Sequence, residues 1–238
     1  MSDCSPRKIL LAMPCGDNRI YTQTMCGVLA VMAAAGNQIT PFWMVGDSNI
    51  SHCRNGIAHY FLTQTDCDTL WFLDSDIVFT LQDFTYLMEG TEQIVIAPYA
   101  RKVMGMQPTG FGMGFARIHR SVFDTLNNLV DEAGEEQLGR YYIEGQGVAT
   151  HFFFTGCSSD ARWFGEDTGF WHFAALTNMT VRYETRTRLG HVGSYVYEYP
   201  DQMPAHMQPY RGPGPYPQTI PEEPVPIPLD HPELMPSE

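Results

Sequence analysis

The sequence is short of lysine, of long apolar runs and of closely spaced cysteines. Lysine occurs only at positions 8 and 102, and 27 acidic residues against 14 basic ones give the 238-residue chain a formal net charge of −13. Nucleic acid is therefore disfavoured as a broad-surface partner, because the neutralisation of phosphates needs clustered Lys and Arg. The acidity still allows an anionic ligand that is held through a metal ion.

No window approaches the roughly 18 to 20 consecutive apolar residues of a membrane span, and the apolar run near the N-terminus is too short for a signal peptide. The six cysteines are scattered and form no CxxC pair. The sequence therefore predicts neither a zinc site nor a disulfide framework. We expect a cytoplasmic protein with no transmembrane segment and with reduced cysteines.

Apolar runs alternate with helical patterns along the first half of the chain, as in βαβ units that build a parallel sheet. Strands are expected at 8–13, 38–45, 69–73, 93–97, 148–155 and 180–184. Helices are expected at 22–35, 51–64, 81–89, 121–132 and 166–176. Ser51 is the expected N-cap of the second helix, and the polar segment 131–147 is expected to be a surface excursion. The sequence thus predicts one α/β domain over 1–199, with a mostly parallel central sheet flanked by helices.

The last forty residues differ in composition from the rest of the chain. Twelve of the 17 prolines lie between Pro200 and Pro236. Proline at this density forbids regular helix and favours extended, polyproline-like backbone. We expect residues 200–238 to form an acidic extended tail, which either covers the domain surface or extends from it. The tail is also a candidate contact between copies of the chain in a homo-oligomer.

The most informative motif is LWFLDSDIVF, in which Asp74 and Asp76 directly follow an apolar strand. Two carboxylates at i and i+2 are expected to point the same way, at the carboxyl end of a sheet, where open α/β folds bind ligands. Burial of both acids is costly unless a cation or a proton compensates. Carboxylate oxygens suit Mg²⁺ or Mn²⁺, which keep positions open for substrate phosphates. The simpler alternative is that one of the two acids only caps the following turn.

Three blocks of the sequence, in order, resemble the GT-A-fold nucleotide-sugar glycosyltransferases, including viral and bacterial members. The blocks are ISHCRNGIAHYFLTQTDCDTLWFLDSDIVF, GFARIHRSVFDTL and GEDTGFWHFAALTNMTVRYETRTRLGHVG. The resemblance covers residues 8–197 and implies a GT-A, Rossmann-like fold. It also implies transfer of a sugar from a nucleoside-diphosphate sugar, such as a UDP- or GDP-sugar, to an acceptor hydroxyl on a glycan, a protein or a hydroxylated DNA base.

The resemblance implies a metal site as well. Asp74 and Asp76 match the DxD pair that holds a divalent metal against the diphosphate of the donor, and Ser75 lies between them. His191 in LGHVG matches a histidine that supplies a third metal ligand in several members. A nitrogen ligand favours Mn²⁺ over Mg²⁺. We therefore expect Mn²⁺, or Mg²⁺, as the cofactor.

Glu166 and Asp167 match the acidic pair that lies near the acceptor in this family. In inverting members such a carboxylate deprotonates the acceptor hydroxyl, and in retaining members it would orient the acceptor. Asp167 is the preferred base and Glu166 the second choice. The structural alternative is that both acids only stabilise the N-terminus of a helix through its dipole.

Further residues match positions at which the family binds the donor. Arg54 and Asn55 match an RN pair, where a guanidinium beside helix N-terminal amides could meet the diphosphate or the acidic cluster around the metal. A salt bridge from Arg54 to Asp74 or Asp76 is the alternative. The remaining expected donor-binding residues are Pro14, Asp17, Asp47, Tyr99 and Arg101, all near the ends of strands. Loops around 105–114 are expected to close over the donor and exclude water.

Two other functions stay open. A nucleotidyltransferase or a phosphohydrolase could use the same acidic pair, although the sequence has no P-loop and no dense cluster of His and Asp. A non-catalytic interaction module could use the Pro-rich tail to dock onto the aromatic groove of a partner.

Overall fold

The computed structural model describes residues 7–100, 102, 112–133, 139–143, 147–157, 162–193 and 196–197. Four parts of the predictions lie wholly or partly outside these residues: the Pro-rich tail, Arg101, most of the 105–114 loop, and positions 134–138 and 144–146 of the 131–147 segment.

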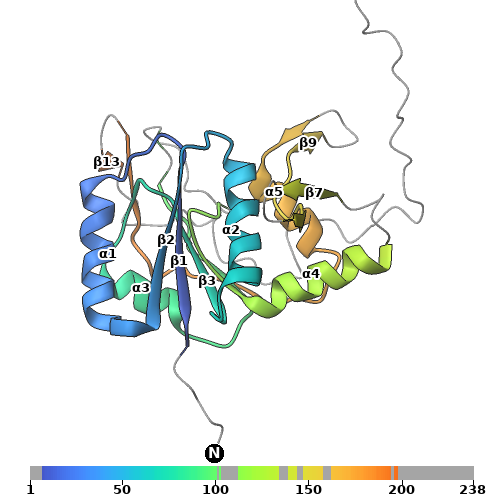
Figure 1. Cartoon of the computed structure of the whole chain (residues 1–238). Helices are drawn as coiled ribbons and strands as arrows, with labels where there is room; N and C mark the ends of the chain where they lie inside the picture. Colours follow the sequence, from blue (N-terminus) through green and yellow to red (C-terminus); the bar gives the residue numbers. More distant parts are fainter. Residues whose placement is uncertain are drawn as a thin grey trace, which may run out of the picture.

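A six-stranded sheet forms the centre of the domain, in the order β11-β5-β6-β3-β1-β2 (Figure 1). Its strands are β1 (Ile9–Cys15), β2 (Ile39–Val45), β3 (Thr69–Leu73), β5 (Ile94–Ile96), β6 (Phe115–His119) and β11 (Val181–Tyr183). β1 pairs in parallel with β2 and β3, and β5 pairs in parallel with β11. β6 is antiparallel to both of its neighbours, β3 and β5. The predicted α/β fold with a mostly parallel sheet is confirmed, with β6 as an inserted strand that the sequence did not predict.

Helices cover both faces of the sheet (Figure 1). They are α1 (Thr22–Ala35), α2 (Ile50–Gln64), α3 (Leu81–Met88), α4 (Arg120–Ala133) and α5 (Glu166–Ala174). Side chains alternate along each strand, so odd and even residues enter different cores. On β3, Leu70 and Phe72 pack with α2, α4 and α5, whereas Trp71 and Leu73 pack with α1 and α3. This two-sided burial explains why TLWFL is apolar at every position after Thr69.

Two local predictions are wrong. Ser51 is not the N-cap of α2: Asn49 is, and its side chain accepts a hydrogen bond from the amide of His52 at 3.2 Å. The expected strand at 148–155 is strand only over β8 (Gly147–Thr150), which pairs with β7 (Arg140–Ile143) outside the central sheet. The described part of the expected surface excursion is therefore the end of α4 and the hairpin strand β7. The helix at 22–35 and the strand at 69–73 are confirmed at both ends.

Short strands bring the last part of the described chain to the carboxyl end of β3. They are β4 (Ile77–Val78), β12 (Gly190–Val192) and β13 (Val196–Tyr197), in the order β13-β12-β4. The register places His191 opposite Ile77, next to Asp76. A separate hairpin of β9 (Gly156–Cys157) and β10 (Trp163–Phe164) precedes α5, and a short 3-10 helix (Gly36–Gln38) follows α1. β12 is therefore the element that carries a residue from late in the sequence to the DSD turn.

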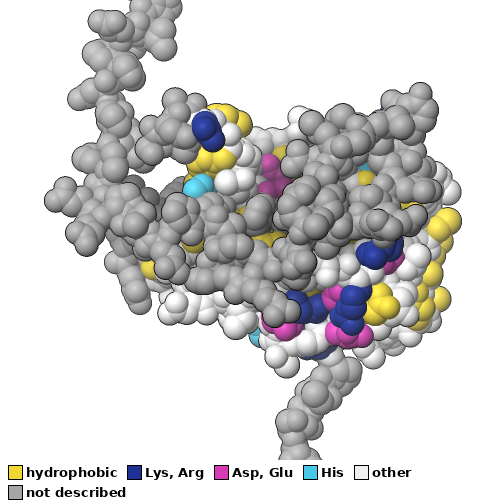
Figure 2. Space-filling view, turned by 180° about the vertical axis from the view of Figure 1, so that it is seen from behind, with side chains coloured by type: hydrophobic (Ala, Val, Ile, Leu, Met, Phe, Trp, Pro, Cys, Tyr) yellow, Lys and Arg dark blue, Asp and Glu magenta, His cyan; other side chains and the backbone are white. Residues whose placement is uncertain are grey.

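The surface of the described residues mixes charges of both signs. On the face seen in Figure 2, basic and acidic side chains lie next to one another and do not form a patch of one sign. Such mixing is seen in the ion pairs of Arg182 and Arg186 with Glu89, Glu92 and Glu184. No helix among the described residues is long and apolar enough to cross a bilayer.

Candidate active site

The segment Asp74-Ser75-Asp76 forms a turn between β3 and β4. Backbone hydrogen bonds fix this turn: Asp74 donates to Gly114, Tyr21 donates to Ser75, and Val192 donates to Asp76. The turn is therefore tied to the start of α1, to the residue before β6 and to β12. Because the pair stands in a turn, the expectation of a shared direction, which holds for an extended strand, does not apply.

The two carboxylates of the turn have different partners. Asp74 Oδ1 lies 3.1 Å from Nη2 of Arg54. Asp76 Oδ1 lies 3.1 Å from Nε2 of His191, and its Oδ2 is ion-paired with Nζ of Lys102. Burial raises the pKa of Asp74, which Arg54 offsets only in part. Burial also raises the pKa of Asp76, but hydrogen bonds from His191 and Lys102 outweigh it, so that the pKa of Asp76 is lowered overall.

A buried arginine on α2 joins three acidic side chains, one from the turn after β3 and two from α5. Arg54 on α2 has a side chain that is only 2% exposed. Besides Asp74, its Nε lies 3.5 Å from Glu166 Oε1 and its Nη1 lies 3.6 Å from Asp167 Oδ1. Among the described residues, neither Nε nor Nη1 has a hydrogen-bond partner, and Asp167 Oδ1 has none either. The salt bridge to Asp74, one of the two alternatives for Arg54, is present. Three carboxylates enclose the guanidinium, which leaves it little room to contact a diphosphate.

Asp167 combines burial with an excess of negative charge. It lies in the first turn of α5, which places its carboxylate near the helix N-terminus. Burial raises the pKa of Asp167 well above the usual range of a carboxyl group. The charge of Arg54 lowers this pKa in part, and the neighbouring Glu166 and Asp74 raise it further. A carboxylate of this kind holds a proton more readily than an exposed aspartate, which is what a general base requires.

The hydrogen bonds of His191 define its protonation. Its Nδ1 lies 2.9 Å from the carbonyl oxygen of Ala100, which can only accept, so Nδ1 carries a proton. Its Nε2 faces Asp76 Oδ1, which is also an acceptor when ionised. The contact between Nε2 and Asp76 Oδ1 is therefore favourable only if Nε2 also carries a proton or if Nε2 and Oδ1 bind the same cation. A ring nitrogen that donates to a backbone carbonyl is the usual support of a metal-bound histidine.

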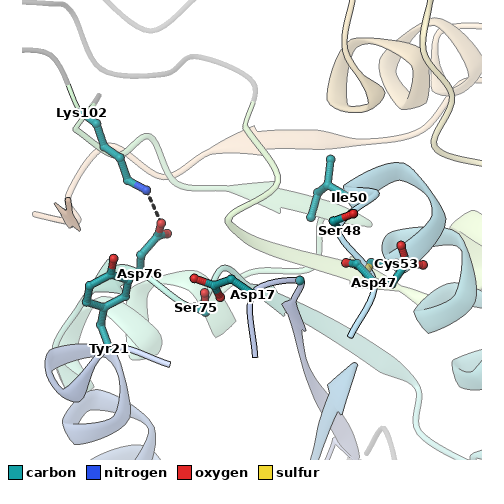
Figure 3. A pocket seen from close by; sticks show the side chains of 10 residues that line it. Asp17, Tyr21, Asp47, Ser48, Ile50, Cys53, Ser75, Asp76 and Lys102 are labelled. Carbon is teal, nitrogen blue, oxygen red and sulfur yellow. Dashed lines mark hydrogen bonds and ion pairs between the residues drawn. The ribbon is translucent and has the colours of Figure 1, made fainter. Parts of the chain in front are cut away.

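A cavity of about 260 Å³ opens beside the turn (Figure 3). Its walls are Gly16, Asp17, Tyr21, Asp47, Ser48, Ile50, Cys53, Ser75, Asp76 and Lys102. β1 and β2 end at this point, with Cys15 paired to Val45 at the last register position. The cavity therefore lies at the carboxyl ends of the parallel strands, where α/β folds bind ligands.

Four of the predicted site residues line this cavity: Asp17, Asp47, Ser75 and Asp76. Asp47 Oδ1 accepts the amide of Asn49 at 2.9 Å, and Oδ2 is paired with Nδ1 of His52. Both oxygens of Asp47 thus have partners in the chain itself. Arg54, Asp74, Glu166 and Asp167 lie together in a charged cluster and are not among the residues that line the cavity. Pro14 is buried within β1, and Arg101 lies outside the described residues.

Tyr99 and Gly114 pack against the Asp74 carboxylate. Tyr99 is 6% exposed, and its ring lies edge-on to His191 with 5.3 Å between the ring centroids. A Cβ atom on Gly114 would lie 2.5 Å from Asp74 Oδ2 and 2.9 Å from the Tyr99 hydroxyl. Glycine is therefore required at 114 for the close approach of β6 to the turn. The Gly-rich composition before β6 was a signal for such a contact, although the sequence did not say with which residue.

Six cavity residues were not predicted: Gly16, Tyr21, Ser48, Ile50, Cys53 and Lys102. Gly16, Tyr21 and Ser48 follow predicted strands within a few residues and could have been inferred from the rule that ligands bind there. Lys102 carries a signal of its own, because lysine is so rare in this chain.

Asn55 has a structural role in the described contacts. It is 1% exposed, and its Nδ2 donates to the carbonyls of Ser51 at 2.9 Å and of Phe153 at 2.7 Å. Its Oδ1 accepts the Phe153 amide at 2.9 Å. Asn55 thus joins α2 to the buried segment that follows β8, away from the cavity wall.

Replacement of Asn55 by leucine is expected to lower the free energy of unfolding by about 1–3 kcal/mol, because it leaves the buried Phe153 amide without a partner. Urea unfolding followed by circular dichroism measures the change. The matched control is Gln64→Leu in the exposed last turn of α2, for which we expect a change within about 0.5 kcal/mol. Unchanged stability together with lost ligand binding would instead make Asn55 a ligand contact.

Within the described ranges, no group of three or more His, Cys, Asp or Glu side chains is arranged to hold a metal ion. The nearest arrangement is the pair Asp76 and His191. A divalent ion bound by two protein side chains takes its other ligands from substrate phosphates and water, which is common for Mg²⁺. The tautomer of His191 fits such a site.

No protein-family model matches the chain, and no curated protein matches it. Among solved structures, A197 from STIV is similar over 83% of this chain and 96% of that chain, with 16% sequence identity and a TM-score of 0.46. A structure described as a glucose-1-phosphate thymidylyltransferase from Bacillus anthracis in complex with a sucrose is similar over 78% of this chain and 89% of that chain. Its sequence identity is 10% and its TM-score 0.35. Likenesses this distant carry no argument about activity, and the functional conclusion depends on the chain's own residues.

Proposed function

We propose that this protein is a metal-dependent glycosyltransferase that moves a sugar from a nucleoside-diphosphate sugar to an acceptor hydroxyl. The observation that carries the proposal is the pair of Asp76 and His191 on the edge of the cavity. His191 Nε2 lies 3.1 Å from Asp76 Oδ1, and the other ring nitrogen of His191 contacts a backbone carbonyl. These two side chains are the ones that would hold Mn²⁺ or Mg²⁺.

The charge balance of the site supports a divalent cation. Within the part of the chain that the structure describes, the four carboxylates of Asp74, Asp76, Glu166 and Asp167 form ion pairs with two permanent cations, Arg54 and Lys102. The site therefore has an excess of about two negative charges when all four acids are ionised. One divalent ion balances this excess.

When bound, the cation would neutralise the charge that develops on the leaving diphosphate. Arg54 holds the carboxylates of Asp74, Glu166 and Asp167 around its guanidinium. Asp17 and Ser75 offer oxygen atoms on the cavity wall that can accept hydrogen bonds from ribose or base. Asp167 Oδ1, which has no hydrogen-bond partner among the described residues and lies 3.6 Å from Arg54 Nη1, takes the proton of the acceptor hydroxyl as the bond to the sugar forms.

Isothermal titration of UDP, GDP and their sugars, with and without Mn²⁺, tests the proposal. We expect at least one nucleotide to bind with Mn²⁺ and to lose binding in EDTA. Asp76→Asn is expected to lose this binding, whereas the control Asp66→Asn, at an exposed aspartate that also pairs with a lysine, is expected to keep it. Binding that is independent of metal, or absent for every nucleotide, contradicts the proposal. Release of pyrophosphate in place of a nucleoside diphosphate would indicate a nucleotidyltransferase.

A further inference from the structure

Among the described residues that line the cavity, Lys102 is the one cation (Figure 3). Each of the two lysines of the chain is ion-paired with an aspartate, Lys8 with Asp66 and Lys102 with Asp76. The first pair is exposed on both sides, with side-chain exposures of 60% and 77%. In the second pair Lys102 is 42% exposed but Asp76 only 17%. The ammonium group of Lys102 therefore reaches from the surface to a carboxylate that is largely enclosed.

Lys102 occupies the carboxylate that a metal would need. Asp76 Oδ1 faces His191, and Asp76 Oδ2 is bound by Lys102. A divalent ion on Asp76 would stand directly beside the ammonium group, and the two positive charges would repel each other. Metal and Lys102 therefore compete for the same carboxylate.

The cavity itself indicates where the displaced ammonium group goes. Its other charged walls are Asp17 and Asp47, of which Asp47 is already paired with His52. The anion that enters with a donor is its diphosphate, and a lysine on a flexible stem is a common point-charge contact for phosphate. The divalent ion that replaces Lys102 keeps a positive charge beside the enclosed Asp76 carboxylate, so this acid is not left unpaired by the exchange.

We propose that Lys102 is an exchanging counter-ion: it neutralises Asp76 in the ligand-free site, yields this carboxylate to the divalent metal, and then binds the diphosphate of the ligand. The inference rests on the proposed function for the metal and for the class of ligand. It adds a phosphate-binding residue that the sequence motifs did not assign. In this exchange Lys102 opposes binding of the metal alone and favours binding of the diphosphate.

Replacement of Lys102 by methionine tests both steps of the exchange, because it is expected to strengthen the binding of the metal and to weaken the binding of the diphosphate. In titrations with Mn²⁺ alone, K102M is expected to bind the metal about threefold more tightly than the wild type, since no ammonium group has to be displaced. In titrations with inorganic pyrophosphate, UDP and GDP at saturating Mn²⁺, K102M is expected to bind about tenfold more weakly. A residue with only a structural role would not shift the two affinities in opposite directions.

The controls are Lys8→Met, which removes the other lysine and is expected to change neither affinity, and Lys102→Arg, which keeps the positive charge and is expected to restore diphosphate binding. Circular dichroism verifies that each variant is folded. Equal or weaker Mn²⁺ binding by K102M overturns the exchange, and unchanged pyrophosphate binding overturns the phosphate contact. In both cases metal-dependent nucleotide binding by the wild type would leave the proposed function intact. A wild type that binds neither Mn²⁺ nor a diphosphate overturns the inference and the proposed function together.

Discussion

Replacement of Asp167 by asparagine is expected to slow sugar transfer by about 100- to 10,000-fold and, at the same time, to raise the melting temperature of the ligand-free protein. The loss of rate follows from the loss of the only atom in the charged cluster assigned to take the acceptor proton. The gain in stability follows from the charge excess, because Arg54 faces three carboxylates and the amide removes one negative charge from that group.

The raised pKa of Asp167 determines how the stabilities of the wild type and D167N differ with pH. The pKa of Asp167 is raised by burial in the folded state, so folding favours its protonated form. Its contribution to stability is fully present below the pKa of the unfolded chain and is lost as the pH rises through the folded pKa. In EDTA, the stability of the wild type should therefore fall relative to D167N as the pH rises from acidic toward neutral values. Urea unfolding at a series of pH values measures this difference.

Glu166→Gln is the matched control for Asp167, because Glu166 lies beside it in the first turn of α5 and faces the same guanidinium. We expect E166Q to keep most of the transfer rate. If E166Q is the slower variant of the two, the base is Glu166 and the assignment of Asp167 is wrong.

Replacement of Arg54 by methionine is expected to lower the free energy of unfolding by about 3–5 kcal/mol at neutral pH. The guanidinium is buried, and its removal leaves Asp74, Glu166 and Asp167 without a positive partner. The loss should become smaller at acidic pH, because the three carboxylates can then take up protons. Chemical unfolding at neutral and acidic pH measures both effects.

Arg186→Met is the control for Arg54. Arg186 also pairs with two glutamates and lies over the Tyr86 ring, but its side chain is 48% exposed. We expect only a small fraction of the effect of R54M, since exposed ion pairs contribute little. A double variant of R54M with D167N should recover part of the loss, because the two side chains interact directly. Equal effects of R54M and R186M would contradict the view that burial makes Arg54 important.

The parts of this protein that the sequence predicts are those set by local pattern. β3 was predicted at both ends because a fully apolar run bounded by polar residues has few other interpretations. Asp74 and Asp76 were predicted at the carboxyl end of the sheet for the same reason. β6 was missed because FARIH includes a charged residue, Arg117, whose buried side chain is satisfied by carbonyls of the segment 88–92. The sequence FARIH alone does not indicate that these carbonyl groups lie close to Arg117.

The roles of single polar residues depended on contacts between distant segments. Asn55 matched a donor-binding position, yet its amide is used by Phe153, 98 positions away. The sequence did not assign a role to Lys102, because its pairing with Asp76 depends on the path of the chain after β5 and not on the spacing of residues in a motif. In both cases the side chain types were visible in the sequence, but the atoms that satisfy them were not.

The pairing of β12 with β4 also determines when the site can exist during synthesis. His191 lies 115 positions after the aspartate that it faces. A nascent chain that has emerged only as far as β11 already contains every strand of the central sheet and all the described residues of the cavity wall. It still lacks the imidazole beside Asp76, so the site is completed only when β12 leaves the ribosome and adds to β4.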